Sequence, residues 1–161
     1  MDTTGGQLSE ALVAVRDAVT GLQSEDLHGV DCGSLLTDVA DLRRLADQVE
    51  GEWLRRVSEV HARGAADVVG AGSTKAFLRG TCLLSPSEAS RAAATATALR
   101  SSCEATAEAV AAGAVGIGQA HVIAKVITDL PSALPEDVRI AGEAVGDHVR
   151  LHPVRSGDRP R

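Results

Sequence analysis

Seven polar side chains between residues 73 and 100 have the types and the spacing that bind the backbone of nucleic acid. Four are the basic residues of this stretch, and three are serines, whose hydroxyl groups can donate to a phosphate oxygen. The seven candidates are Ser73, Lys75, Arg79, Ser87, Ser90, Arg91 and Arg100. Four cationic contacts to phosphate predict a moderate affinity that falls as the salt concentration rises. Such contacts position a protein on double-stranded DNA but do not read its sequence.

The stretch LLSPSEASRA has to position these side chains, and it carries the signals of a helix start. Ser85 can accept a hydrogen bond from a backbone N–H, Pro86 suits the first helical position, and Glu88 completes a capping box. The sequence therefore predicts a helix over residues 86–99, preceded by a short helix over residues 73–79. Two helices joined by a tight turn are typical of the helix-turn-helix, whose second helix meets base edges.

A helix-turn-helix alignment assigns a side to each residue of the second helix. Ala89 and Ala92 become its buried contacts. The side chains that then face outward are Ser87, Ser90 and Arg91. Two positions depart from the motif, because Leu83 stands in the turn where glycine is common, and Arg79 stands where a small residue is common. Two interpretations stay open: a DNA-contacting helix pair, or a solvated polar face over a helical bundle.

The composition of the 161-residue chain favours helices throughout. Hydrophobic residues make up 44% of the chain, but 27 of these residues are alanine, and there is one Trp, one Phe and no Tyr. Alanine is the best helix former, whereas strands are rich in β-branched and aromatic residues. We therefore predict an all-α fold whose core buries little area per residue.

Two apolar series predict a long N-terminal helical hairpin over residues 1–64. The first series, with spacings of three and four, consists of Leu8, Leu12, Val15, Val19 and Leu22. The second, which begins near Ser34 and ends at Gly64, consists of Leu35, Val39, Leu42, Ala46, Val49, Trp53, Val57 and Val60. The second helix is the longer one, so part of its apolar stripe extends past the first. We expect this part to pack on the C-terminal half or, as a short coiled coil, on a second copy in a homodimer.

The hairpin is predicted to pack on a bundle of short helices over residues 73–130. Ser101 and Glu104 repeat the capping-box spacing and predict another helix, which ends at Gly113. The remaining expected segments are helices over residues 119–130 and 136–150 and a disordered tail over residues 151–161. We expect one helical domain over residues 1–150.

The charge distribution leaves room for a local basic surface on an acidic protein. The net charge is −6, but residues 1–52 carry a balance of −8 and residues 53–103 one of +4. Three well-separated cysteines without a C-x-x-C pair fit free thiols in the cytoplasm. No spacing of His, Cys, Asp or Glu suggests a catalytic, cofactor or metal site, and the longest uncharged run, residues 109–124, is too short and polar to span a membrane. We therefore expect no enzyme activity, no cofactor and no membrane partner.

Three further side chains with reactive groups are expected to have structural roles. His61 lies at the end of the long helix, where a cation complements the helix dipole. His121 has no carboxylate or nucleophile spaced to serve it, so we expect a partly buried helix residue. Cys82, in the turn, is expected to be a small packed side chain, although a position beside Arg79 would suit a reactive thiol.

Three consecutive stretches resemble the actinobacterial 13E12 repeat family, also called domain of unknown function 222. They are LRRLADQVEGEWLRRVSEVHARGA, GSTKAFLRGTCLLSPSEASRAAATATAL and ATAEAVAAGAVGIGQAHVIAKVITDLP, which cover residues from about 40 to 131. Members often carry this helical region ahead of an HNH endonuclease domain, so the resemblance implies a DNA-associated module. An HNH site needs a general-base histidine and metal ligands, whereas residues 132–161 offer only His148 and His152. The resemblance therefore implies the helical region without its nuclease.

The sequence leads to two main hypotheses about function. The first is a non-enzymatic helical module of the 13E12 repeat type that binds DNA weakly and is a truncated or frame-altered relative of HNH-associated proteins. The second is a self-associating interaction domain that uses the uncovered stripe of the long helix and binds no nucleic acid. A third hypothesis, a remnant without selected activity, is not distinguished from these by the sequence.

Overall fold

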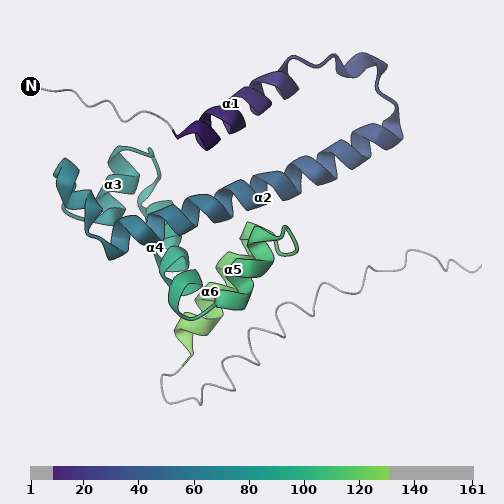
Figure 1. Cartoon of the computed structure of the whole chain (residues 1–161). Helices are drawn as coiled ribbons and strands as arrows, with labels where there is room; N and C mark the ends of the chain where they lie inside the picture. Colours follow the sequence, from purple (N-terminus) through teal and green to yellow (C-terminus); the bar gives the residue numbers. More distant parts are fainter. Residues whose placement is uncertain (1–8, 131–161) are drawn as a thin grey trace, which may run out of the picture. The chain divides into compact units, whose positions relative to one another are not determined.

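The computed structural model describes residues 9–130 of the chain (Figure 1). These residues form six α-helices and two short 3-10 turns and contain no strand, which confirms the predicted all-α fold. The elements are α1 (Glu10–Gln23), η1 (Leu27–Gly29), α2 (Cys32–Ala62), η2 (Ala65–Val69), α3 (Thr74–Gly80), α4 (Pro86–Ser101), α5 (Glu104–Ala111) and α6 (Ile117–Asp129). The chain divides into two compact units, with the boundary between Ala40 and Asp41. The expected single domain over residues 1–150 extends beyond the described residues and stays a prediction.

The first unit contains α1 and the start of α2. Ser9 caps α1, since its hydroxyl oxygen accepts from the backbone N–H of Leu12 at 3.4 Å. No residue of α1 is buried. The described members of its predicted apolar stripe, all exposed, are Leu12, Val15, Val19 and Leu22. Leu8 lies outside the described residues. The helix itself is confirmed, whereas its pairing in a hairpin stays a prediction.

An aspartate starts α2 slightly earlier than predicted. Oδ1 of Asp31 accepts from the backbone N–H groups of Gly33 at 2.9 Å and Ser34 at 3.1 Å. The helix consequently begins at Cys32 rather than near Ser34, and it runs to Ala62. Hydrogen bonds from the Ser34 hydroxyl and from these two N–H groups lower the pKa of Asp31.

In the second unit, the buried side of α2 differs from the predicted apolar stripe. Leu42 and Val49 belong to that stripe and are exposed, so the packing of this part of the stripe on another helix or on a second copy stays a prediction. The buried residues of the helix are Asp47, Leu54, Val57 and Ser58. Gly51 lies close to α5, because a Cβ at this position would be 2.5 Å from Cγ1 of Val110. Small and polar residues therefore let the partner helices approach more closely than a stripe of large side chains would allow.

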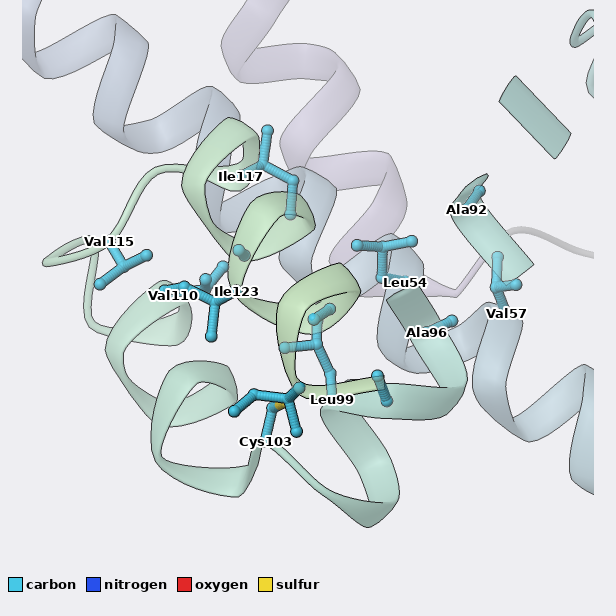
Figure 2. Close-up of a cluster of buried hydrophobic side chains, with 14 of the residues drawn as sticks. Leu54, Val57, Ala92, Ala96, Leu99, Cys103, Val110, Val115, Ile117 and Ile123 are labelled. Atoms are coloured by element: carbon cyan, nitrogen blue, oxygen red, sulfur yellow. The ribbon is translucent and has the colours of Figure 1, made fainter. Parts of the chain in front are cut away.

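Helix α4 is the centre of the second unit and packs against α3, α5 and α6. Its buried residues are Ala89, Ala92, Ala93, Thr95, Ala96, Ala98 and Leu99. Because most of these side chains are small, neighbouring helices lie close to α4 and contribute larger side chains to the core (Figure 2). These include Leu54 of α2, Leu78 of α3, Val110 of α5 and Ile123 of α6. The predicted bundle of short helices is thus present.

Two helix starts differ from prediction because their caps are not the expected ones. Ser101 is the last residue of α4, and its hydroxyl donates to the carbonyl of Thr97 at 2.9 Å. The residue before α5 is Cys103, which forms no side-chain cap. The predicted capping box of Ser101 and Glu104 is therefore wrong. Helix α6 begins at Ile117, two residues before the predicted start, because a carboxylate of α2 caps it.

Part of the predicted pattern lies outside the described residues. This applies to the helix over residues 136–150, to the tail over residues 151–161, and to His148 and His152. Within the described part, Gly113 follows α5 with a φ of 71°, as expected of a glycine that ends a helix.

Candidate nucleic-acid interface

Two separate helices, α3 and α4, meet at the turn that was predicted to position the polar side chains (Figure 1). Both halves of the capping box form at the start of α4. Oγ of Ser85 accepts from the N–H of Glu88 at 3.3 Å, and Oε2 of Glu88 accepts from the N–H of Ser85 at 2.9 Å. The hydrogen bonds with Ser85 lower the pKa of Glu88. Pro86 follows as the first residue of α4, so Ser85 is the helix start that the sequence predicts.

The turn between α3 and α4 contains a leucine in a left-handed backbone conformation. Leu83 has a φ of 58°, and this conformation costs a residue with a Cβ roughly 1–2 kcal/mol. Its side chain is also 85% exposed, so burial does not offset the cost. The N–H of Leu84 donates to the carbonyl of Leu78 at 3.3 Å and ties the turn to α3. The turn thus adopts a conformation that favours glycine, the residue common in helix-turn-helix turns.

The exposure of the side chains on α4 follows the predicted sides of the helix. Ala89 and Ala92 are buried in the core, as the helix-turn-helix alignment requires. Ser87 and Arg91 are exposed, and Ser90 is half-buried. The alanine side of α4 therefore packs inward, and the start of the helix presents Ser87 and Arg91 to solvent.

The basic side chains of the described residues fall into two groups according to their ion pairs. Eight of them form an ion pair with a carboxylate: Arg16, Arg43, Arg44, Arg55, Arg56, Arg63, Arg100 and Lys125. Within residues 9–130 the other three, Lys75, Arg79 and Arg91, have no ion pair, and all three are exposed. They belong to α3 and to the first half of α4. The structure therefore leaves unpaired cations on the two helices of the predicted interface.

Two of the predicted serines take part in hydrogen bonds at the helix starts. Oγ of Ser73 caps α3 by accepting from the N–H of Ala76 at 3.1 Å. Oγ of Ser87 lies 3.1 Å from Oγ of Ser85. Both residues are exposed, and each keeps some hydrogen-bonding capacity because a hydroxyl group both donates and accepts.

Arg100 differs from the other basic candidates because it is paired across helices. Its Nη1 donates to Oε1 of Glu59 on α2 at 2.7 Å, while Arg63 donates to Oε2 of the same carboxylate at 2.8 Å. The hydrogen bond from Arg63 is the main cause of the lowered pKa of Glu59, and the charge of Arg100 adds to it. Arg100 thus joins α4 to α2, and the structure does not bring it into the group of unpaired cations.

A polar contact between α4 and α6 involves His121, which the sequence predicts to be a partly buried helix residue. Oγ1 of Thr95 lies 2.8 Å from Nδ1 of His121, which is half-buried as predicted. Burial lowers the pKa of His121, the charge of Arg91 lowers it further, and Glu50 acts in the opposite direction. Because Thr95 and His121 are 26 positions apart, no local sequence pattern connects them.

A buried carboxylate of α2 holds the start of α6. Oδ1 of Asp47, which is 8% exposed, accepts from the N–H of Ile117 at 3.0 Å. Arg43, one turn earlier on α2, forms an ion pair with the same carboxylate, and the hydrogen bond raises the pKa of Arg43. Nε2 of Gln48 donates to the carbonyl of Ala111 at 2.9 Å. These bonds attach the connection between α5 and α6 to α2 and so fix the position of α6.

A cavity of about 390 Å³ lies between α2, α4 and α5. Leu99 and Val110 contribute apolar surface, and its charged residues are all ion-paired. One of them, Glu52, accepts from Arg55 and Arg56, and these bonds, chiefly that from Arg55, lower its pKa to about 2. The cavity therefore offers an apolar surface without an unpaired charge.

The sequence from residue 35 to residue 156 matches a family model described as a domain of unknown function, DUF222. The chain belongs to the DUF222 family. The match includes most of α2 and all of α3 to α6, whereas α1 lies before it. No curated protein and no solved structure matches this DUF222 chain. The resemblance that the sequence suggested is thus confirmed at the level of the family.

In the part of the DUF222 protein that the structure describes, no helix is long and apolar enough to cross a membrane. No cluster of three metal-ligating side chains occurs among the same residues. The candidate site of the DUF222 protein is accordingly the pair of helices α3 and α4, with Lys75, Arg79 and Arg91 as its unpaired cations.

Proposed function

We propose that this DUF222 protein is a non-enzymatic helical module of the 13E12 repeat type that binds double-stranded DNA weakly through α3 and α4. The observation that carries the proposal is the pattern of ion pairs. Among the basic residues that the structure describes, the three without a carboxylate partner are Lys75, Arg79 and Arg91. All three lie on the helices that the sequence assigns to a helix-turn-helix.

The local charge supports attraction of an anionic partner. No Asp or Glu occurs from residue 68 to residue 87, so the positive potential of Lys75 and Arg79 is not cancelled nearby in the sequence. Three phosphate contacts would give the logarithm of the binding constant a slope of roughly −2.7 against the logarithm of the salt concentration. The net charge of −6 opposes the approach of DNA, which is why the proposed binding is weak.

The proposal also includes an association with nucleases and a cellular location. The resemblance to the 13E12 repeat group supports an association with HNH endonucleases, in which similar helical regions precede the nuclease domain. Cys32, Cys82 and Cys103 form no disulfide, and reduced thiols suit the cytoplasm, which we propose as its location. We assign no residue to catalysis.

Fluorescence anisotropy with a labelled DNA duplex at low and moderate salt tests the proposal. We expect binding at low salt that weakens as salt rises, and a loss of most of it in the double variant Arg79→Ala/Arg91→Ala. The matched control is Arg44→Ala/Arg55→Ala, which changes the net charge equally but removes arginines that are already ion-paired. We expect the control to bind nearly as well as the wild type.

Two results would contradict DNA binding through α3 and α4. One is the absence of binding to the duplex even at low salt. The other is an equal loss of affinity in the two double variants, because DNA would then respond only to the net charge of the protein. Circular dichroism of each variant checks that the helices are intact.

A second candidate function, self-association, is favoured by a different observation. Five large apolar side chains of α2, between residues 36 and 49, are exposed: Leu36, Val39, Leu42, Leu45 and Val49. Apolar side chains repeated along one helix are typical of helix–helix interfaces between chains. The partner in this proposal is a second copy of the chain, and no nucleic acid is bound.

Light scattering over a range of protein concentrations tests self-association. We expect a dimer that Leu42→Glu dissociates, whereas Thr37→Glu, which adds the same charge at an exposed polar position, leaves it intact. A strict monomer at high concentration contradicts this candidate function.

A further inference from the structure

A pocket of about 330 Å³ between α4 and α6 brings together polar and positive groups from both helices. Arg91 and Thr95 come from α4, and His121, Lys125 and Thr128 come from α6. Arg91 has no ion pair among the described residues. Because Arg91 also belongs to the proposed DNA interface, the pocket adjoins that interface and adds groups from a third helix.

The contact between α4 and α6 determines which ring nitrogen of neutral His121 carries the hydrogen. The hydroxyl groups of Thr97 and Thr128 donate to the carbonyls four residues earlier, whereas the described bonds of Thr95 include none of this kind. A buried hydroxyl hydrogen needs an acceptor, and Nδ1 of His121 lies 2.8 Å from Oγ1 of Thr95, so we infer that Thr95 is the donor. The hydrogen of the ring then lies on Nε2, which has no partner among residues 9–130 and can donate to an anion.

A carboxylate near Lys125 competes with any anion for this pocket. Nζ of Lys125 donates to Oδ2 of Asp129 at 2.5 Å, and both side chains are exposed. Exposed pairs of this kind are weak, so an anion that also contacts Arg91 and His121 can displace Asp129. Glu50 and Glu88 line an adjoining hollow together with Arg91 and His121. These carboxylates lower the affinity for an anion.

We propose that the α4–α6 pocket is a phosphate-binding site in which Arg91, Lys125 and the Nε2–H of His121 contact one phosphate group. Three donors from two helices surround a tetrahedral anion better than a single helix face does. The phosphate belongs to the backbone of DNA bound by α3 and α4, which rests on the proposed function, or to a free phosphate ion or monoester. In the first case α6 contributes two contacts to the DNA interface.

Nuclear magnetic resonance of the His121 imidazole, with inorganic phosphate as the probe, tests the pocket without DNA. Chloride keeps the ionic strength constant through the titration. We expect a saturable shift of the Nε2 resonance and a rise in the pKa of His121, because a bound anion favours the protonated ring.

Three variants test the assignment of the contacts. Lys125→Ala should weaken phosphate binding about threefold, and Asp129→Asn should strengthen it by a similar factor, since each removes one exposed charge near the anion. Lys125 is 75% exposed, so its replacement leaves the fold intact. Arg44→Ala, the matched control, removes one exposed and ion-paired charge elsewhere and should have no effect.

The second arm measures the salt dependence of duplex binding by fluorescence anisotropy. If the phosphate comes from DNA, Lys125→Ala lowers the salt slope by about 1 in absolute value, and Arg44→Ala leaves it unchanged. A response of His121 to inorganic phosphate, together with the lowered salt slope in Lys125→Ala, supports the pocket and identifies DNA as the source.

The remaining outcomes separate this proposal from the proposed function. If His121 responds to inorganic phosphate and no duplex is bound, the pocket stands with free phosphate as its ligand, and the DNA proposal fails. If duplex binds but neither the His121 resonance nor the salt slope in Lys125→Ala changes, the pocket is overturned and DNA binding through α3 and α4 stands. No response to either probe overturns both.

Discussion

The arginines of α2 and the basic residues of α3 and α4 differ in what neutralises their charge. Every arginine of α2 has a carboxylate within about one turn on the same helix: the pairs are Arg43–Asp47, Arg44–Asp41, Arg55–Glu52 and Arg56–Glu52. Helix α3 contains no acidic residue. The one carboxylate of α4, Glu88, accepts from the backbone at the helix start. The arginines of α2 are therefore neutralised within their own helix, whereas the basic side chains of α3 and α4 are available to a ligand, apart from Arg100, which pairs with Glu59.

This difference shows that spacing matters more than the count of charges. Residues three or four apart on a helix are neighbours, so a basic residue placed at that distance from a carboxylate loses much of its attraction for an external anion. A segment with a positive balance is the stronger candidate interface where such partners are missing or, like Glu88 three residues before Arg91, accept from the backbone. By this criterion the unpaired cations identify α3 and α4, although α2 contains more arginines.

The largest effect is expected for Asp47, which is buried and links α2 to α6. Asp47→Ala should lower the free energy of unfolding by about 2–3 kcal/mol, because it removes the acceptor of the buried N–H of Ile117. Asp41→Ala removes an exposed carboxylate of the same helix and should cost less than about 1 kcal/mol. Urea denaturation measures both values. Equal losses would show that the ion pairs of α2 are alike and that Asp47 has no special role.

The capping box should have the next largest effect, because it fixes the start of the helix that carries Arg91. Ser85→Ala is expected to lower the free energy of unfolding by about 1 kcal/mol, since the N–H of Glu88 loses its acceptor. Ser101→Ala is the matched control, because Ser101 lies at the end of α4 and caps no helix. Thermal denaturation followed by circular dichroism compares the two variants. A larger loss in Ser101→Ala would contradict the assignment of the cap.

The turn between α3 and α4 offers a stabilising substitution. Leu83→Gly should raise the free energy of unfolding by about 0.5–1 kcal/mol, because glycine adopts the left-handed conformation without strain and little buried surface is lost. Leu83→Ala keeps a Cβ and should show no gain. Chemical denaturation distinguishes the two variants, and equal stability in both would mean that the backbone of this turn is not strained. If the side chain of Leu83 contacts DNA, DNA binding should change in both Leu83→Gly and Leu83→Ala.

The smallest effect is expected at acidic pH and concerns Glu52, an ion-paired carboxylate of α2. The pKa of Glu52 in the folded protein is about 2, below its ordinary value of 4.5, because Arg55 and Arg56 bind the carboxylate. Its stabilising contribution is therefore complete above pH 4.5 and is lost as the pH falls toward 2. Since the side chains are exposed, this contribution should be below about 1 kcal/mol.

The variant Glu52→Gln tests this pH dependence. Its melting temperature should fall less steeply than that of the wild type between pH 4.5 and pH 2. High salt should reduce the difference, because screening weakens the pairs that cause it. Parallel curves for the two proteins at low salt would contradict the contribution of Glu52.

The helices could be predicted from the sequence because their signals are local. Ser85, Pro86 and Glu88 lie within one turn, and Gly113 ends a helix through its own backbone conformation. The alanine side of α4 could be predicted from the same stretch, since the helix-turn-helix alignment places Ala89 and Ala92 inward. The three unpaired cations are all among the residues predicted from the sequence. Their lack of an ion pair, however, can be established only from the positions of the carboxylates in the structure.

The features that could not be predicted depend on residues far apart in the sequence. The buried side of α2 contains Asp47 and Gly51, which an apolar pattern excludes, because their partners on α5 and α6 follow many residues later. The pairing of Arg100 with Glu59 spans 41 positions. The failed box at Ser101 has the right spacing, but α4 continues through this residue. In the first two cases the outcome is decided by packing between helices, and in the third by the residue at which α4 ends.

The hydrogen bond between Asp47 and Ile117 joins residues 70 positions apart, and this separation has a consequence during synthesis. At roughly 5–20 residues per second, the ribosome needs on the order of ten seconds to make the segment that follows α2 and completes its contacts. Throughout that interval the carboxylate and the glycine beside it are open to water and to other chains. In the nascent chain, the bond that attaches α6 to α2 can thus form only after the start of α6 has been synthesised.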